Sequence, residues 1–284
     1  MWGRPYPLTV LRSLVVSALV VLAIVVSVPR GAPVPNARPH LTSAVRPLTD
    51  PPTARGIDVA DHQHALGPIH WRVVASQYQF AYVKATEGTS YVNRYYRGDV
   101  SSALSAGLFV GGYAFATPDA ASGAAEAKYF LRHSRYGQNR TLLFPMLDIE
   151  WNPYKTTTAC YGLSPSALVS WIGSYSDTIS RALGVRPIIY TQASFWNKCT
   201  GGTSAFSADP LWVGSDQTAS APDLPAGFAS WTIWQDVNSS AAGVEGPVDV
   251  DGFHGTAAQL KAQLTPPGWR GELPLKAYPA GYRH

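Results

Sequence analysis

The chain has 284 residues, of which 46% are hydrophobic and only 14% are charged, so it can bury a sizeable core. Its net charge is +4, but no basic run stands out, which argues against nucleic-acid binding because that function needs a concentrated basic patch. Aromatic residues make up 12% of the chain, a proportion typical of exported sugar-binding proteins, although packing alone gives the same composition.

The N-terminal segment predicts export. Arg4 and Arg12 precede an apolar run at residues 14–28 that is interrupted only by Ser17 and Ser27. A positive segment followed by an apolar run of this length is typical of an export signal. Because no clean cleavage site follows, residues 1–28 are either a signal peptide or a membrane anchor. Both alternatives predict a protein that is extracellular or associated with the cell envelope.

Residues 29–53 are rich in proline and predict a semi-rigid linker. From Gly56 onward, short β-branched segments alternate with helical stretches. Eight strands are predicted, at residues 56–60, 80–84, 109–115, 143–149, 187–190, 211–213, 232–235 and 248–253. Helices are predicted at residues 94–106, 120–133, 166–183 and 256–264.

This alternation predicts an α/β fold. Strands that alternate with helices pair in parallel, and eight of them over this length indicate a (β/α) barrel that resembles a TIM barrel. The later crossovers are too short for full helices, so we expect an irregular barrel of about eight mostly parallel strands. We assign residues 54–265 to one catalytic domain and residues 266–284 to a C-terminal tail without a domain pattern.

Cys160 and Cys199 are the only cysteines. Export favours their oxidation, and neither lies in a cluster typical of a metal site. We therefore predict a structural disulfide between them, and neither a metal nor a cofactor.

Acidic residues follow or lie within three of the predicted strands. They are Asp58 and Asp61 near the end of the first, Asp148 and Glu150 at the end of the fourth, and Asp249 and Asp251 in the last. Active sites of such barrels lie at the C-terminal ends of the strands. Because closure brings the first and last strands together, Asp58 and Asp249 are expected to flank one opening.

Asp148 and Glu150 are two residues apart, so both side chains of a strand point to the same side. The apolar residues 142–147 before them predict a buried strand, where two neighbouring acids cannot both ionise cheaply. A Glu with a raised pKa beside an ionised Asp can protonate a glycosidic oxygen. Such a pair alone is more often structural, but further acids at the same mouth, beside Trp151, Tyr154 and Trp234, favour catalysis.

Several motifs occur in order across residues 56–255. They are GIDVADHQ (56–63), Trp71, FAYVKATEGTSYVN (80–93), GLFVGGYAFATP (107–118), FPMLDIEW (144–151), PIIYT (187–191), PLWVG (210–214), IWQ (233–235) and VDVDGFHG (248–255). With these motifs the chain resembles the family 25 glycoside hydrolases, the lysozymes (N-acetylmuramidases) of bacteria and phages. The resemblance also extends to the cysteine pair of secreted members.

The resemblance implies roles for the matching residues. Glu150 would be the general acid and base, and Asp148 would orient the 2-acetamido group of the substrate or stabilise an oxazolinium-like intermediate. Asp58 and Asp249 would complete the catalytic set by lining the subsite of the cleaved sugar. Tyr190 and Trp234 match aromatic positions that shape the groove, and we also predict that Tyr113 and Trp151 bind substrate. The implied substrate is the glycan strand of peptidoglycan, cleaved with net retention. The resemblance favours participation of the acetamido group, and direct attack by a carboxylate stays open as the alternative. We expect a monomer.

The sequence departs from the family pattern at a few positions. Ala114 stands where the family often has His, which predicts the loss of one hydrogen bond in the groove, and Ala60 replaces the usual Ser. Asp251, where Asn is more usual, is assigned no catalytic role. Glu87 in the KATEG motif is either an ion-pair partner at the barrel rim or a substrate contact. His62, His64 and His70 are interpreted as surface or core residues rather than as a metal site.

Two other functions stay open at this point. A chitinase-like enzyme would use related chemistry, but the longer Asp-x-x-Asp-x-Asp-x-Glu run is absent, since residues 144–147 are apolar. A catalytically silent wall-binding module would keep the groove without turnover. The full set of four acids disfavours such a module, because binding alone does not require it.

Overall fold

The computed structural model describes residues 54–136, 142–215 and 221–265. The predicted export segment, the linker and the C-terminal tail lie outside these residues. Among the helices in the described residues, none combines the length and the apolar character needed to span a membrane.

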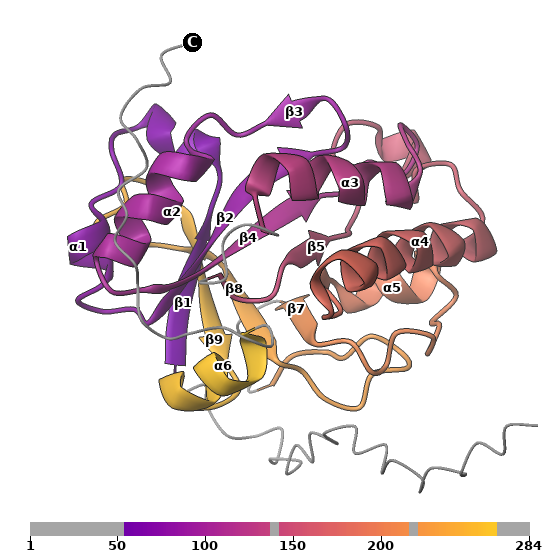
Figure 1. Cartoon of the computed structure of the whole chain (residues 1–284). Coiled ribbons are helices and arrows are strands. Elements are labelled where there is room, and N and C mark those ends of the chain that lie inside the picture. The colour runs from indigo at the N-terminus through magenta and orange to yellow at the C-terminus, as the bar shows by residue number, and fades with distance from the viewer. Residues whose placement is uncertain (1–53, 137–141, 216–220, 266–284) are drawn as a thin grey trace, which may run out of the picture. The chain divides into compact units, whose positions relative to one another are not determined.

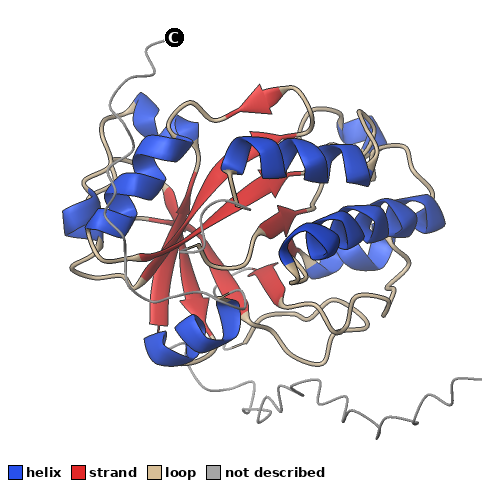
Figure 2. Cartoon of the chain, viewed as in Figure 1, coloured by secondary structure: helices blue, strands red, loops and turns tan. Residues whose placement is uncertain are grey.

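Eight strands form a closed barrel in the middle of the domain, with helices around it (Figures 1 and 2). These strands are β1 (Ala54–Val59), β2 (Phe80–Glu87), β4 (Phe109–Phe115), β5 (Met146–Asp148), β6 (Ile188–Thr191), β7 (Leu211–Ser215), β8 (Ile233–Ser239) and β9 (Val248–Phe253). The short β3 (Tyr91–Val92) forms a hairpin with the end of β2. Pairing of β1 with β2 closes the barrel, so the predicted irregular α/β barrel is confirmed.

Helices follow most of the strands. They are α1 (Trp71–Val74), α2 (Tyr96–Ser105), α3 (Gly123–Ser134), α4 (Pro165–Leu183), α5 (Ala193–Cys199) and α6 (Ala257–Leu264), with 3-10 turns at Asp61–Ala65 and Thr156–Thr158. Local signals fix their ends: the Ser164 side chain caps α4 just before Pro165, and Gly184 ends it in the left-handed conformation at φ 73°. The sequence predicted α2, α3, α4 and α6, but not α1 or α5.

The barrel strands are mostly parallel, as predicted, and the last strand is the exception. β9 runs antiparallel to both of its neighbours, β8 and β1. Only residues 240–247 connect β8 to β9, whereas a parallel crossover needs about a dozen residues or more. As a consequence Asp249, at the start of β9, reaches the same mouth of the barrel as the C-terminal ends of the parallel strands.

Two apolar layers fill the domain. The inside of the barrel holds a cluster that includes Tyr82, Tyr190 and Trp212, with the ring of Trp212 edge-on to both tyrosines. Leu260 and Leu264 of α6 complete this cluster at the end where the parallel strands begin. A larger cluster fills the space between the strands and the outer helices. The inside is therefore closed at one end, and polar groups gather at the other.

Candidate active site

A pocket of about 430 Å³ lies at the C-terminal ends of the parallel strands. Its lining residues come from nearly every strand of the barrel: Asp58, Ala60, His62, Lys84, Tyr113, Phe115, Met146, Asp148, Glu150, Tyr190, Gln192, Gln235 and Asp249. Four of them are carboxylic acids. This is the edge at which the acids were expected to meet.

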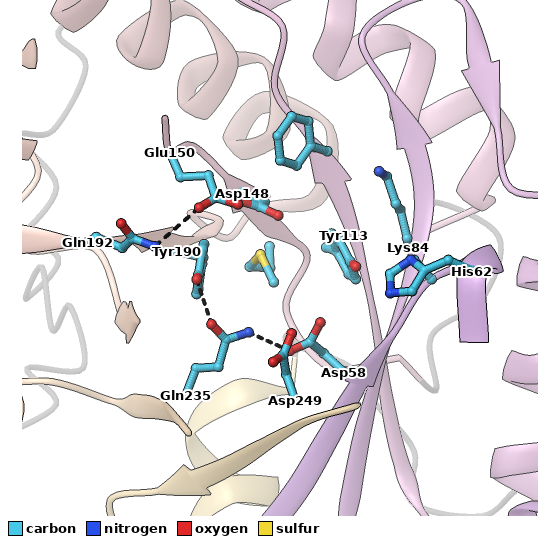
Figure 3. Close-up of a pocket in the computed structure, with 13 residues that line it drawn as sticks. Asp58, His62, Lys84, Tyr113, Asp148, Glu150, Tyr190, Gln192, Gln235 and Asp249 are labelled. Carbon is cyan, nitrogen blue, oxygen red and sulfur yellow. Dashed lines mark hydrogen bonds between the residues drawn. The ribbon is translucent and has the colours of Figure 1, made fainter. Parts of the chain in front are cut away.

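The four acids stand on two walls of the pocket. Figure 3 shows Asp148 and Glu150 together on one side and Asp58 and Asp249 together on the other. The first pair belongs to β5, which ends at Asp148, and to the residues just after it. In the second pair, Asp58 of β1 and Asp249 of β9 are direct partners in the antiparallel ladder. A ligand in the pocket therefore faces carboxyl groups on both sides.

Glu150 has the pKa of a group that can both give and take a proton near neutral pH. Burial, followed by the negative charge of Asp249, raises the pKa of Glu150 to about 7, while the ammonium group of Lys84 opposes the rise. Burial in a medium of low dielectric disfavours the charged form of a carboxyl group. At neutral pH a substantial fraction of Glu150 therefore carries a proton.

The neighbouring acids are shifted in the same direction. Burial and the nearby Glu150 raise the pKa of Asp148 well above its usual value, and the positive charge of Lys84 opposes this rise. Burial and the charge of Asp249 likewise raise the pKa of Asp58, against hydrogen bonds from Gln235 and Tyr113 that lower it. Two acids on each wall thus compete for ionisation, as close carboxyl pairs do.

A chain of short hydrogen bonds fixes the position of Asp58. The hydroxyl of Tyr190 donates to Gln235 Oε1 at 2.5 Å, and Gln235 Nε2 donates to Asp58 Oδ2 at 2.8 Å (Figure 3). Gly214 of β7 makes this possible, because a Cβ there would lie 2.5 Å from the Tyr190 hydroxyl oxygen. The amide of Gln235 can donate only through its nitrogen, so Asp58 Oδ2 must accept.

The wall that holds Asp148 and Glu150, called the acid wall below, has fewer hydrogen bonds than the wall that holds Asp58 and Asp249. Gln192 Nε2 donates to Glu150 Oε2 at 3.3 Å. Lys84 is the one lysine or arginine among the described residues that line the pocket, and its ammonium lies 4.8 Å from the centroid of the Phe115 ring. Lys84 also forms an ion pair with Glu87 at 2.5 Å. The arrangement supplies an acid near its titration point, a neighbouring carboxyl group and a single cation among the described lining residues.

The sequence matches the family model for glycosyl hydrolases family 25 over residues 57–244, which include Asp58, Asp148 and Glu150, whereas Asp249 follows the matched range. The chain belongs to glycosyl hydrolases family 25. It is therefore a glycoside hydrolase, and the resemblance to the family 25 lysozymes inferred from the motifs is confirmed.

Relatives of this family 25 enzyme include proteins named as a lysozyme and as a muramidase. It is similar to Lysozyme M1 of Streptomyces globisporus, with 38% identity over 75% of this chain and 72% of the relative. It is also similar to an N,O-diacetylmuramidase of Chalaropsis sp, with 36% identity over 67% of this chain and 91% of the relative. Among solved structures, the lysozyme of Streptomyces coelicolor superposes with a TM-score of 0.69 at 39% identity, over 75% of this chain and 97% of that one.

Most of the predicted site residues of the family 25 enzyme come together in the pocket. Besides the four acids, Tyr113 and Tyr190 line it, and burial raises the pKa of both phenols well above the usual value. Trp151 and Trp234 do not line this pocket. Trp151 packs edge-on against Phe195 of α5, and Trp234 packs against the outer cluster beside Trp231.

The sequence reasoning missed the two glutamines of the site. Gln192 follows Tyr190 by two residues, as Glu150 follows Asp148, so strand alternation alone would have placed both on the pocket side. Gln235 follows Trp234 directly, and only the register of β8 with β7 turns the glutamine inward and the tryptophan outward. His62, named only as a surface or core residue, also lines the pocket.

Three further predictions concern residues near the pocket. Glu87 does form an ion pair at the rim, and it accepts a hydrogen bond from the hydroxyl of Tyr154. Ala114 does not face the groove: it is buried in the outer cluster, so the expected loss of a groove hydrogen bond is wrong. Cys160 and Cys199 are joined in a disulfide.

Proposed function

We propose that this enzyme hydrolyses the β-1,4 bond between N-acetylmuramic acid and N-acetylglucosamine in bacterial peptidoglycan, with Glu150 as the general acid and base. The observation that carries the proposal is the pocket itself. Glu150 stands there with a pKa of about 7, beside Asp148 and opposite Asp58 and Asp249. The lysozyme and muramidase names of its relatives support the choice of peptidoglycan as substrate.

The proposed reaction uses the substrate's own acetamido group. Glu150 gives its proton to the glycosidic oxygen as the bond from C1 of the muramic acid residue breaks, and the acetamido oxygen bonds to C1. Asp148 accepts a hydrogen bond from the acetamido N–H and stabilises the positive charge of the oxazolinium-like intermediate. Ionised Glu150 then takes a proton from water, whose oxygen bonds to C1 and reopens the ring with net retention.

Asp58 and Asp249 are proposed to bind the sugar whose bond is cleaved. Because Gln235 and Tyr113 fix Asp58 by hydrogen bonds, this wall can hold sugar hydroxyl groups in one orientation. Tyr113 and Tyr190 present neutral phenols to the same space. We also propose that the enzyme is exported through its N-terminal segment, and the Cys160–Cys199 disulfide is consistent with an oxidising compartment.

The test compares the wild-type enzyme with Glu150→Gln on purified peptidoglycan. Loss of a general acid typically costs about 10²- to 10⁴-fold in rate, so we expect a fall of roughly 10³-fold in the release of reducing ends. Equal release by both proteins would show that Glu150 is not the acid. Mass spectrometry of the released muropeptides identifies the sugar at the new reducing end, which is N-acetylmuramic acid if the proposal is right.

The same assay separates the other two functions. Turnover of chitin oligomers at a rate equal to that of peptidoglycan would favour a chitinase-like enzyme. Binding to cell wall without any soluble product after long incubation would favour a silent binding module. We expect peptidoglycan to be the better substrate and soluble muropeptides to appear.

A further inference from the structure

Gln192 lies just beyond the end of β6, as Glu150 lies just beyond the end of β5. In the parallel pairing of these strands, Asp148 lies beside Tyr190, and the N–H of Ile149 donates to the Tyr190 carbonyl at 3.0 Å beyond the last paired residues. Glu150 stands two residues after Asp148, and Gln192 stands two residues after Tyr190. Both line the pocket, and Gln192 Nε2 donates to Glu150 Oε2 at 3.3 Å (Figure 3).

The helix that begins at Gln192 is joined to the loop that follows Glu150. Gln192 is the N-cap residue of α5, and its carbonyl accepts the N–H of Trp196 at 2.9 Å. The disulfide between Cys160 and Cys199 connects the end of this helix to the loop. Both partners of the hydrogen bond are therefore held in place: Gln192 by the helix that it begins, and Glu150 by the loop that the disulfide joins to this helix.

Trp151, directly after Glu150, adds two noncovalent contacts to this connection. Its ring lies edge-on to Phe195 of α5 with the centroids 5.4 Å apart. The ammonium of Lys198, also on α5, lies 5.7 Å from the centroid of the Trp151 ring. The loop carrying the acid and the helix carrying Gln192 thus share a disulfide, an aromatic contact and a cation–π contact.

A carboxylic acid can deliver its proton only from the oxygen that carries it. The amide nitrogen of Gln192 can only donate, so Oε2 of Glu150 accepts, and the proton of neutral Glu150 belongs on Oε1. We propose that Gln192 is a positioning residue that keeps the proton of Glu150 on Oε1 and points that oxygen at the scissile bond. This inference rests on the proposed role of Glu150 as the acid.

The experiment uses two substrates that differ in their need for an acid. Soluble peptidoglycan chains have a sugar leaving group that must be protonated, whereas a dinitrophenyl β-glycoside of the same N-acetylated sugar leaves without a proton. For Gln192→Leu, which removes the donor, we expect kcat to fall about tenfold on the chains and less than about twofold on the dinitrophenyl glycoside. KM should change little.

The pH profile gives a second readout. A donated hydrogen bond favours the ionised form of a carboxyl group, so its loss should move the basic limb of the kcat profile to higher pH. The other titratable or charged groups that line the pocket are unchanged in this variant: Asp58, His62, Lys84, Tyr113, Asp148, Tyr190 and Asp249. A role limited to structure would lower kcat at every pH without moving the limb.

Two control variants keep the test decisive. Ser194→Ala changes an exposed residue of α5 and should leave both rates unchanged. Gln192→Asn keeps the amide but shortens the side chain, and should fall between the wild-type enzyme and Gln192→Leu. An equal loss on both substrates, no loss on either, or a faster Gln192→Leu enzyme would overturn the positioning role.

The failure of this inference can be told apart from the failure of the proposed function. If Glu150→Gln abolishes activity while Gln192→Leu behaves like the wild-type enzyme on both substrates, Glu150 is the acid and only the positioning role of Gln192 is wrong. If Glu150→Gln retains full activity on peptidoglycan, the proposed function itself is wrong.

Discussion

The two walls of the pocket hold their acids in different ways. Asp58 lies within β1 and receives a 2.8 Å hydrogen bond from Gln235, which is itself fixed by a 2.5 Å hydrogen bond from Tyr190. Glu150 lies two residues beyond Asp148, where β5 ends, and receives a hydrogen bond of 3.3 Å from Gln192. The wall that holds Asp58 and Asp249 is part of the sheet, whereas Glu150 stands on a loop that α5 supports.

This difference fits the proposed roles of the two walls, which are sugar binding by Asp58 and Asp249 and proton transfer by Glu150. A carboxyl group that binds sugar hydroxyl groups benefits from a fixed position, and the hydrogen bonds to Asp58 oppose the rise in its pKa that burial and Asp249 cause. An acid that exchanges its proton during each turnover must keep its pKa close to neutral, and strong donors would lower that pKa. Glu150, with the long hydrogen bond from Gln192, has a pKa of about 7.

The largest loss of activity is expected from Gly214→Ala, which disturbs the hydrogen bonds of the wall that holds Asp58 and Asp249. The new methyl group would lie 2.5 Å from the Tyr190 hydroxyl and 3.3 Å from Gln235 Oε1, so the chain of hydrogen bonds to Asp58 must shift. We expect the rate to fall about 10²-fold, measured by reducing-end release, and the free energy of unfolding to fall by about 1–3 kcal/mol in denaturant titrations.

Gly173→Ala is the matched control for that substitution. Gly173 lies in α4, where a Cβ would meet no atom within 4 Å. Alanine in a helix interior is favoured over glycine by about 1 kcal/mol, so this variant should be as stable as the wild-type enzyme or slightly more so, and fully active. Normal activity of Gly214→Ala would mean that the position of Asp58 does not matter for catalysis.

A smaller effect on rate is expected when the support of the acid wall is weakened. The double variant Cys160→Ser, Cys199→Ser removes a crosslink between residues 39 apart in sequence, which lowers the free energy of unfolding by about 4 kcal/mol in the chain-entropy model. Because Phe195 and Lys198 still contact Trp151, kcat should fall only about threefold to fivefold well below the melting temperature. An unchanged melting temperature would contradict the structural role of the disulfide.

Much of the fold and of the site could be predicted from the sequence, and the rest could not for physical reasons. The alternation of apolar segments predicted the barrel, and two-residue spacing placed Asp148 and Glu150 on one side of a strand. The antiparallel direction of β9 was not predicted, because the predicted strands leave residues 236–247 for a crossover, whereas β8 extends to Ser239 and leaves only residues 240–247. The predicted meeting of Asp58 with Asp249 was right because closure of the barrel does not depend on that direction.

The two glutamines show where sequence reasoning ended. A neutral amide gives no charge pattern, and whether Trp234 or Gln235 faces the pocket depends on a strand register that spacing does not reveal. For Ala114, alternation along β4 was available and would have placed the side chain opposite to Tyr113, away from the groove. The four acids of the pocket were predicted, whereas Lys84 and the two glutamines that orient the acids were not.

Substitutions of two oppositely charged residues, Asp249 and Lys84, test how their charges set the pH dependence of the rate. The charge of Asp249 raises the pKa of Glu150 and that of Lys84 lowers it. Asp249→Asn should therefore lower this pKa from about 7 and move the basic limb of kcat/KM to lower pH, while Lys84→Met should move it to higher pH. We expect shifts of about half to one pH unit, independent of any loss of maximal rate. Shifts in the same direction would show that another group sets this limb.

The smallest effect is expected at the rim, where Tyr154 donates a hydrogen bond to Glu87. Tyr154 is 65% exposed, and contacts at such positions contribute little because water competes for both partners. The ion pair between Glu87 and Lys84 remains in Tyr154→Phe, so Lys84 keeps its place near the acids and the rate should change by less than about twofold. Glu87→Gln removes the charge paired with Lys84 and should cost several-fold more in the same reducing-end assay. If Tyr154→Phe were the more damaging of the two, the rim loop that carries Tyr154 would itself belong to the acid wall, and support of Glu150 would not come from α5 alone.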